Sequence, residues 1–386
     1  MYLFDNDYSE GAHPNILKAI VTANLDQTLG YGEDAYTKKA QDMIRELVAS
    51  KDADVYFITG GTLTNIVVLS HILRPYEAVI ATDEAHIYTH ETGAIEATGH
   101  KVIALDNVNG KLDVDEVEKV ILAHKDHHMV LPKVLFVSNA TELGTIYSRA
   151  ELIALKELAV KYDMYLYLDG ARLAVALAST TNDLTYQDIG MICDVFYIGG
   201  TKNGALFGEA LVVVNDDLKK NFNYSIKQKG ALFAKGKFLA IQFIELYTND
   251  LSVKLARHAN AMAQKISDAF SGNGYRLYTP TQINQVFVVV NNDKLDLFNQ
   301  QFQGQVWGPF TDTSSIVRYT TSWATKHEQV DNFVDLIAKN VQPVGSLEDQ
   351  APVLSLDYIT RKEEFEDQGV KAVDLDEKDK IEDLRF

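Results

Sequence analysis

The sequence predicts an α/β fold in which a mostly parallel sheet is flanked by helices and is followed by a smaller α+β domain. From residue 54 onward, short apolar runs alternate with longer amphipathic segments. Short apolar runs indicate buried strands, and strands that alternate with helices indicate a parallel sheet covered on both faces. After residue 236 the pattern changes to one long helical segment, Phe238–Phe270, followed by shorter runs. This change is typical of a second, smaller unit.

Local signals mark the elements of the large domain. Asp113–His124 carries its aliphatic side chains on one helical face, and Ser148–Tyr162 begins with Ser148 and, three residues later, Glu151. This spacing predicts a capping box, which marks the start of a helix. Seven apolar runs are expected to form the strands: Val55–Ile58, Ala78–Ala81, Val102–Leu105, Val134–Val137, Met164–Leu168, Val195–Ile198 and Leu211–Val214.

The chain is expected to divide into four parts: an N-terminal segment packing with the small domain (1–20), the large domain (21–245), the small domain (246–341) and an acidic tail (342–386). The small domain is expected to contain strands at Val286–Asn291 and Ser315–Thr320 and a helix at Glu328–Asn340. The tail has 13 acidic and 6 basic residues. Its charge favours a solvated segment. The alternative is a strap that docks on a neighbouring subunit through its apolar side chains.

Composition argues against several classes of protein. The chain is 46% hydrophobic and 23% charged, as is ordinary for a soluble globular protein, and its formal net charge is −18. An acidic surface repels nucleic-acid phosphates and anionic lipid, so we expect neither nucleic acid nor membrane as a partner. The single cysteine, Cys193, cannot form an internal disulfide. The N-terminus lacks the features of a signal peptide, and no apolar run reaches the roughly 20 residues of a membrane span. We therefore expect a cytoplasmic enzyme.

One candidate site follows the strand-like run that ends at Ile198. Two glycines, Thr201, Lys202 and, two residues later, a third glycine come after it. Open α/β sheets bind ligands at the carboxyl ends of their strands. Burial lowers the pKa of a lysine, and the neutral amine is the form that attacks a carbonyl. Lys202 is therefore a candidate nucleophile; the alternative is a surface lysine in a glycine-rich turn.

A second candidate site follows the run that ends at Leu168. Asp169 comes next, and Arg172 follows three residues later, where it can reach an anion. A carboxylate at a strand end can keep a pyridine nitrogen protonated, so that the ring accepts electrons. The alternative is that Asp169 caps the next helix. About one helix and one strand separate Asp169 from Lys202, so both are expected at the same edge of the sheet.

Two further motifs point to ligand binding. Gly60, Gly61 and Thr62 lie between a strand-like and a helical run, where free N–H groups and the helix dipole favour a phosphate; the alternative is an ordinary N-cap by Thr62. The spacings of Walker A and dinucleotide motifs are absent, which disfavours nucleotide binding. His86 and His90 are four residues apart, but no motif supplies a third metal ligand, so we expect no metal. His86 is instead a candidate for ring stacking or acid–base chemistry.

These motifs together resemble the threonine aldolase and β-eliminating lyase family of fold-type-I enzymes that depend on pyridoxal phosphate (PLP). The likeness runs from about Phe4 to Asn340. It rests on the joint order of the motifs above with a YGED motif at Tyr31–Asp34 and a VRYTTSW motif at Val317–Trp323. The resemblance implies PLP fold type I and PLP as the cofactor.

The resemblance also implies a role for each matched residue in holding the cofactor. Lys202 would form the Schiff base with PLP, Asp169 would pair with the ring nitrogen, and His86 would stack on the ring. Gly61 and Thr62 would hold the phosphate.

Other matched residues would bind the substrate. Arg172, beside the cofactor, and Arg318 would clamp the carboxylate of a small amino acid, and Asn6 stands where the family usually has a serine. Tyr31 and the loop Lys227–Lys235 would reach the active site of a neighbouring subunit. The resemblance therefore implies a homodimer or homotetramer with shared active sites.

The implied activity is retro-aldol cleavage of threonine or allo-threonine, and of related β-hydroxy amino acids, to glycine and an aldehyde. The base would be His86 or a bound water. Thr141 replaces the histidine of the family's ENTH motif, which contributes to the choice between stereoisomers, so the threo or allo preference stays open. The alternative activity is that of another PLP-dependent β-lyase or an aminotransferase. A non-catalytic protein of this fold would tend to lose Lys202 or Asp169, and both are present.

Overall fold

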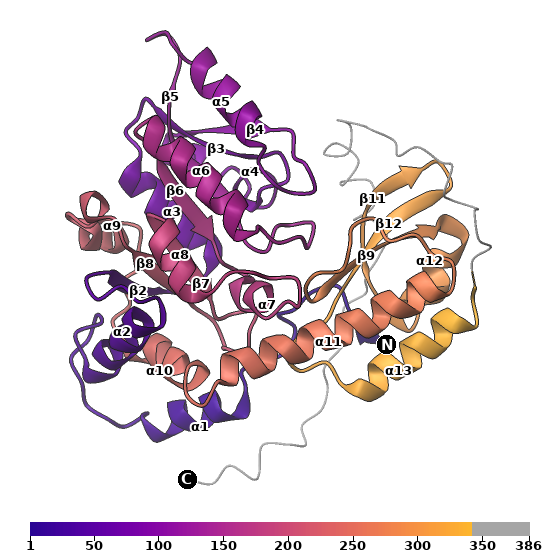
Figure 1. Ribbon diagram of the computed structural model, residues 1–386. Helices are drawn as coiled ribbons and strands as arrows, with labels where there is room; N and C mark the ends of the chain where they lie inside the picture. Colours follow the sequence, from indigo (N-terminus) through magenta and orange to yellow (C-terminus); the bar gives the residue numbers. More distant parts are fainter. Residues whose placement is uncertain (342–386) are drawn as a thin grey trace.

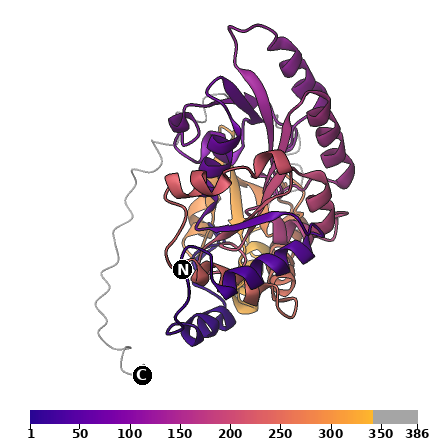
Figure 2. The ribbon, with the colours of Figure 1, turned by 90° about the vertical axis from the view of Figure 1, so that its left-hand side faces the viewer.

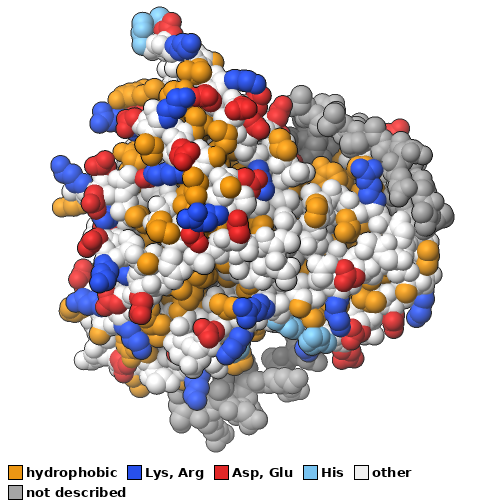
Figure 3. Space-filling view, viewed as in Figure 1, with side chains coloured by type: hydrophobic (Ala, Val, Ile, Leu, Met, Phe, Trp, Pro, Cys, Tyr) orange, Lys and Arg blue, Asp and Glu red, His pale blue; other side chains and the backbone are white. Residues whose placement is uncertain are grey.

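The structure, a computed structural model, describes residues 1–341 and has a large part and a small part, each built on its own sheet (Figure 1). The predicted acidic tail, 342–386, lies outside the described residues. Within residues 1–341, none of the helices combines the length and the apolar character needed to span a bilayer. On the face seen in Figure 3, acidic and basic side chains are interspersed over the large part rather than gathered by sign.

The large part contains a seven-stranded sheet that is parallel except for one strand. Only β8 runs against its neighbours, because β7 and β8 form a hairpin around the loop that carries Lys202. The predicted mostly parallel sheet is therefore confirmed, and each of the seven predicted runs overlaps one strand, although Met164 and Val214 lie just outside theirs. In spatial order the strands are β2 (Asp54–Ile58), β8 (Glu209–Val213), β7 (Val195–Gly199), β6 (Tyr165–Asp169), β5 (Leu131–Ser138), β3 (Glu77–Thr82) and β4 (Lys101–Leu105).

Helices cover both faces of this sheet because alternate strand residues bury apolar side chains on opposite sides. In β7, Phe196 and Ile198 face one core, whereas Val195 and Tyr197 face the other. Figure 2 shows two of the covering helices, α5 and α6, along one side. The predicted capping box of Ser148 with Glu151 is present at the start of α6. The first core is covered by α2 (Ala35–Leu47), α5 (Val114–Ala123), α6 (Arg149–Lys161), α8 (Tyr186–Ile192) and α10 (Lys237–Leu246), and the second by α3 (Gly61–Ile72), α4 (His86–Thr89) and α9 (Phe222–Gln228).

The small part is an antiparallel three-stranded sheet packed against long helices. The single helix expected at Phe238–Phe270 is wrong: α10 ends at Leu246, and α11 begins at Leu251. Asn249 and Asp250 break the helix in left-handed conformations, with φ of 54° and 57°, which Asn and Asp tolerate better than most residues. The elements of this part are α11 (Leu251–Gly272), β9 (Gln285–Asn291), α12 (Asn292–Asn299), β11 (Gln305–Thr311), β12 (Ser314–Thr320) and α13 (His327–Ala338).

The N-terminal segment contacts both parts. The strand β1 (Tyr2–Leu3) pairs in parallel with β10 (Phe302–Gln303), and Phe4 enters the core of the small part. The following helix, α1 (Pro14–Thr22), instead packs against α10. The segment between β1 and α1 therefore crosses the edge of the large sheet, where it brings Asp7 beside Arg172.

Candidate active site

The carboxyl ends of the parallel strands meet at one edge of the sheet. Here β6 and β7 approach each other so closely that two glycines are required. A Cβ on Gly170 would lie 1.8 Å from the carbonyl oxygen of Tyr197, and a Cβ on Gly199 would lie 2.4 Å from that of Ala171. The glycines after the two strands therefore bring the segment of Asp169 and the loop of Lys202 together, as the sequence predicted.

Lys202 lies in the β7–β8 loop with its amine turned into this edge. The side chain is half-buried, so a freely exposed surface lysine is excluded. Within residues 1–341 its Nζ makes no hydrogen bond. Burial, and after it the positive charge of Arg172, lowers the pKa of Lys202, although the acidic groups of Asp7, Asp169 and Glu209 oppose this change. The environment thus favours a neutral, nucleophilic amine.

Asp169, at the end of β6, is held by a buried polar network. Its Oδ1 accepts hydrogen bonds from the Tyr197 hydroxyl at 2.5 Å and from the backbone N–H of Ala171 at 3.0 Å. Its Oδ2 has only a long contact, 3.4 Å, with Nδ2 of Asn65. The alternative role as a helix cap is wrong, because the next helix, α7 (Leu173–Leu177), has no side-chain cap. One carboxylate oxygen is therefore fixed and the other retains capacity to accept a proton donor.

His86, the first residue of α4, is oriented by a second carboxylate. Its Nδ1 lies 2.8 Å from Oε1 of Glu91, whose side chain is fully buried. The same Glu91 oxygen accepts a hydrogen bond from Asn65, which also contacts Asp169. The His90 ring lies 5.6 Å from the His86 ring and packs on an aromatic side chain. His86 is thus connected to Asp169 through Glu91 and Asn65.

The N-terminus of α3 offers uncapped donors to a ligand. Its N-cap is Gly60, which has no side chain to satisfy the first N–H groups. The N-cap alternative for Thr62 is therefore wrong: Thr62 lies inside the first turn, next to Gly61. Free N–H groups at the start of a 12-residue helix form an anion site.

Two arginines converge on the same region. Arg172 forms a two-pronged ion pair with Asp7, Nε to Oδ2 at 2.8 Å and Nη2 to Oδ1 at 3.0 Å. Arg318 donates to the carbonyl of Asp5 and to the side chain of Gln305, and its buried Nε has no partner within the described residues. Burial, and after it the charge of Arg172, lowers the pKa of Arg318 to about 10. Among the described residues, the two arginines together have one carboxylate partner, Asp7, and a bound anion would balance the remaining positive charge.

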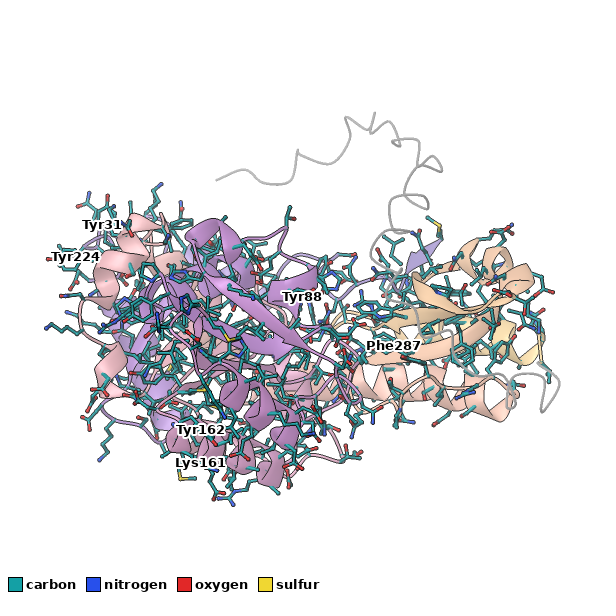
Figure 4. All side chains as sticks on the ribbon, turned by 90° about the horizontal axis from the view of Figure 1, so that it is seen from above. Tyr31, Tyr88, Lys161, Tyr162, Tyr224 and Phe287 are labelled. Atoms are coloured by element: carbon teal, nitrogen blue, oxygen red, sulfur yellow. The ribbon has the colours of Figure 1, made fainter. Side chains whose placement is uncertain are left out.

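Two further predicted site residues, Asn6 and Tyr31, make local contacts in the structure. Asn6 accepts hydrogen bonds from the backbone of Tyr8 and the hydroxyl of Ser9, so its carbonyl oxygen holds a local turn. Tyr31 is exposed beside Lys227, whose Nζ lies 4.5 Å from the ring centre. Figure 4 shows Tyr31 at the outer end of the large part, away from Tyr88 of α4. Tyr31 therefore lies at the surface of the large part, apart from the α4 residue Tyr88.

Sequence reasoning missed several residues of this site. Asp7 gave no signal of its pairing, because its partner lies 165 positions away. Glu209 accepts from the Thr201 hydroxyl at 2.9 Å and the Gly200 N–H at 3.1 Å, and so fixes the loop before Lys202. Burial raises the pKa of Glu209 to about 8. A lone glutamate at the start of an apolar strand was the signal that could have found it.

The fold and this edge define the class of the protein: the architecture is that of the fold-type-I PLP-dependent enzymes. A solved structure of Leishmania major threonine aldolase is similar, with a TM-score of 0.87 and 46% identity over 89% of this chain and 100% of that chain. A Thermus thermophilus aspartate aminotransferase, at 14% identity and a TM-score of 0.66 over 88% of this chain and 91% of that one, shares the fold.

The family follows from the sequence comparisons. A family model described as beta-eliminating lyase matches residues 7–293, and the chain belongs to this family. A low-specificity L-threonine aldolase of Pseudomonas sp. is 32% identical over 334 residues, which is 85% of this chain and 94% of the relative. That of Escherichia coli is 26% identical over 329 residues, 82% and 92% of the two chains. The resemblance seen in the sequence is confirmed.

Proposed function

We propose that this protein is a PLP-dependent aldehyde lyase that cleaves threonine or allo-threonine, and related β-hydroxy amino acids, to glycine and an aldehyde. The relatives named threonine aldolase support this reaction. The observation that carries the proposal is the amine of Lys202, which lies at the sheet edge near Asp169 with a lowered pKa and no hydrogen bond within residues 1–341.

The residues at the edge fit PLP. Lys202 offers the amine that would hold the cofactor covalently, and Asp169 offers a carboxylate oxygen to its ring nitrogen. The uncapped start of α3, at Gly61 and Thr62, offers N–H donors to its phosphate. When bound, PLP supplies a ring that accepts the electrons released when a bond to Cα breaks.

The arginines give the substrate its orientation. Asp7 neutralises Arg172, but Arg318 has no carboxylate partner among the described residues. A substrate carboxylate between the two guanidinium groups would supply the missing negative charge. Holding the carboxylate fixes the directions of the other bonds at Cα, and thereby selects the bond to be cleaved.

A second candidate is β-elimination, because the family model is described by that reaction. The products separate the candidates: a β-lyase releases pyruvate and ammonia, an aminotransferase an oxo acid, and an aldolase glycine and an aldehyde.

A homodimer or homotetramer with shared active sites is part of the proposal. The support is the exposed position of Tyr31 and Lys227, with Tyr31 lying apart from Tyr88 of α4 in Figure 4. Mixing an inactive Lys202→Ala chain with an inactive Tyr31→Ala chain should restore part of the activity, because some mixed dimers contain one intact site. No recovery on mixing would contradict shared sites. The cytoplasmic location stays a prediction.

The cofactor assignment has a direct test. The purified protein with added PLP should show the visible absorbance of lysine-bound PLP, and Lys202→Ala should lose it. Lys119→Ala is a matched control, since Lys119 is exposed and, within the described residues 1–341, forms its ion pair with Glu116. Retained absorbance in Lys202→Ala would overturn the assignment.

A further inference from the structure

The threonine that replaces the family's histidine is buried in a turn and bonded to Thr145. Thr141 is fully buried, and its hydroxyl lies 2.7 Å from the hydroxyl of Thr145. The Thr141 hydroxyl also accepts the backbone N–H of Thr145 at 3.2 Å. Both contacts lie within one turn, so Thr141 has a structural role. Its hydroxyl is engaged with Thr145, so Thr141 itself is not a candidate for the base that takes the substrate hydroxyl proton.

The next residue, Glu142, does reach the site. Its Oε1 accepts a hydrogen bond from the backbone N–H of His86 at 3.1 Å and from the hydroxyl of Ser138 at 3.0 Å. These bonds hold the carboxyl between the end of β5 and the start of α4. Glu142 interacts electrostatically with Asp169 and with Arg172 as well. Its carboxyl therefore contacts the start of the His86 helix and interacts with the charges of Asp169 and Arg172.

The second oxygen of this carboxyl is available. The hydrogen bonds from His86 and Ser138 both go to Oε1 of Glu142, and the residue keeps partial exposure. Burial and the negative charge of Asp169 raise the pKa of Glu142, against the effect of His86. The other titratable neighbour is the buried hydroxyl of Tyr147. A raised pKa strengthens the carboxylate as a base, as suits a group that takes and returns a proton.

We propose that Glu142 is the catalytic base that accepts the proton of the substrate β-hydroxyl. This inference rests on the proposed aldolase function. In the cleavage step the O–H proton passes to Oε2 of Glu142, and the O–H electron pair forms the carbonyl bond of the aldehyde. The Cα–Cβ pair stays with the glycine fragment. In the synthetic direction, Glu142 returns the proton to the new hydroxyl. Because the turn buries Thr141, the proton is accepted by the next residue, Glu142.

A merely structural role predicts different behaviour. Glu142 could act only as an acceptor for the first N–H of α4, and Glu142→Gln would keep an acceptor oxygen for that bond while removing the base. General-base catalysis is typically worth about 10²–10⁴-fold in rate. We therefore expect aldehyde release by Glu142→Gln to fall at least about 100-fold. Exchange of the glycine α-proton in D₂O, which requires Lys202 but no hydroxyl, should stay close to the wild-type rate.

Two further measurements do not depend on turnover. PLP affinity should be unchanged in Glu142→Gln. A potentiometric difference titration of the cofactor-free proteins should show one extra proton released by the wild type above pH 4.5, the ordinary pKa of glutamate. Thr141→Val is the matched control: it removes the neighbouring hydroxyl, which is bonded to Thr145, and should retain aldehyde release.

The outcomes separate the two proposals. Equal losses of aldehyde release and glycine exchange in Glu142→Gln, or no loss of either, would overturn the role of Glu142 alone. No aldehyde from the wild type with any β-hydroxy amino acid would overturn the proposed function and this inference with it. A selective loss of aldehyde release supports both.

Discussion

The ion pair between Asp7 and Arg172 is predicted to stabilise the folded protein and to orient Arg172 for substrate binding. Asp7 is 1% exposed and the side chain of Arg172 12%, and two hydrogen bonds join them. Removing one partner of a buried ion pair leaves the other charge uncompensated, which costs about 3–5 kcal/mol. We therefore expect Asp7→Asn to lower the free energy of unfolding of the cofactor-free protein by about 3 kcal/mol or more.

The pair also makes stability depend on pH. Burial alone would raise the pKa of Asp7, but the charges of Arg172 and then Lys202 outweigh it, and the net pKa is lowered from 3.8. The stabilisation is therefore fully present above pH 3.8 and is lost as the pH falls through the lower, folded-state pKa. The difference between wild type and Asp7→Asn should shrink in that acidic range.

The assay is urea denaturation followed by circular dichroism at fixed protein concentration. Asn6→Ala is the matched control, because Asn6 contacts only a local turn and should cost about 1 kcal/mol. Asp7→Asn should also raise the KM for the amino-acid substrate, because Arg172 loses the partner that orients it. A free energy of unfolding within about 1 kcal/mol of wild type, with an unchanged KM, would show that the ion pair neither stabilises the fold nor orients Arg172.

Three further predictions concern the sheet edge. Glu209 keeps its proton in the folded state up to about pH 8, whereas in the unfolded chain it loses the proton near pH 4.5. The stability of the wild type should therefore fall relative to that of Glu209→Gln as the pH rises between these values. Urea denaturation of both proteins at pH 5 and pH 8 tests this, and a constant difference in stability contradicts it. Gly170→Ala should lower the stability measured by thermal unfolding by about 3 kcal/mol or more, because the added Cβ would lie 1.8 Å from a backbone oxygen. Gly60→Ala is the control and should lose far less stability, because its Cβ would have no atom within 4 Å. Equal losses of stability in the two variants would contradict the steric explanation. Tyr197→Phe removes the 2.5 Å hydrogen bond to Asp169. We expect it to lower the free energy of unfolding in urea by about 1.5–3 kcal/mol, and a loss below about 0.5 kcal/mol would contradict this prediction.

The parts of the fold that depend on local pattern were predictable. The strands of the large sheet are short apolar runs, and their order along the chain places Asp169 and Lys202 at one edge. The strand β11 was missed because its pairing with β12 is irregular near Gly308 and Pro309, which interrupts the alternation of side chains.

The connections within the site were not predictable, because they join distant segments. Asn65 and Tyr167 are bonded to each other although 102 positions separate them. Likewise, the sequence showed that Thr141 replaces a histidine, but not that its side chain is buried in a turn with Thr145. Only the fold shows that Glu142 is the residue that reaches the site.

Identification of the products gives the most direct test of the proposed aldolase reaction. The purified protein with PLP would be incubated with threonine and, separately, with allo-threonine, and the products followed by proton NMR. Glycine and acetaldehyde in equal amounts, from at least one of the two substrates and absent with Lys202→Ala, are the predicted result. Pyruvate with ammonia or an oxo acid, formed without glycine, would contradict the account.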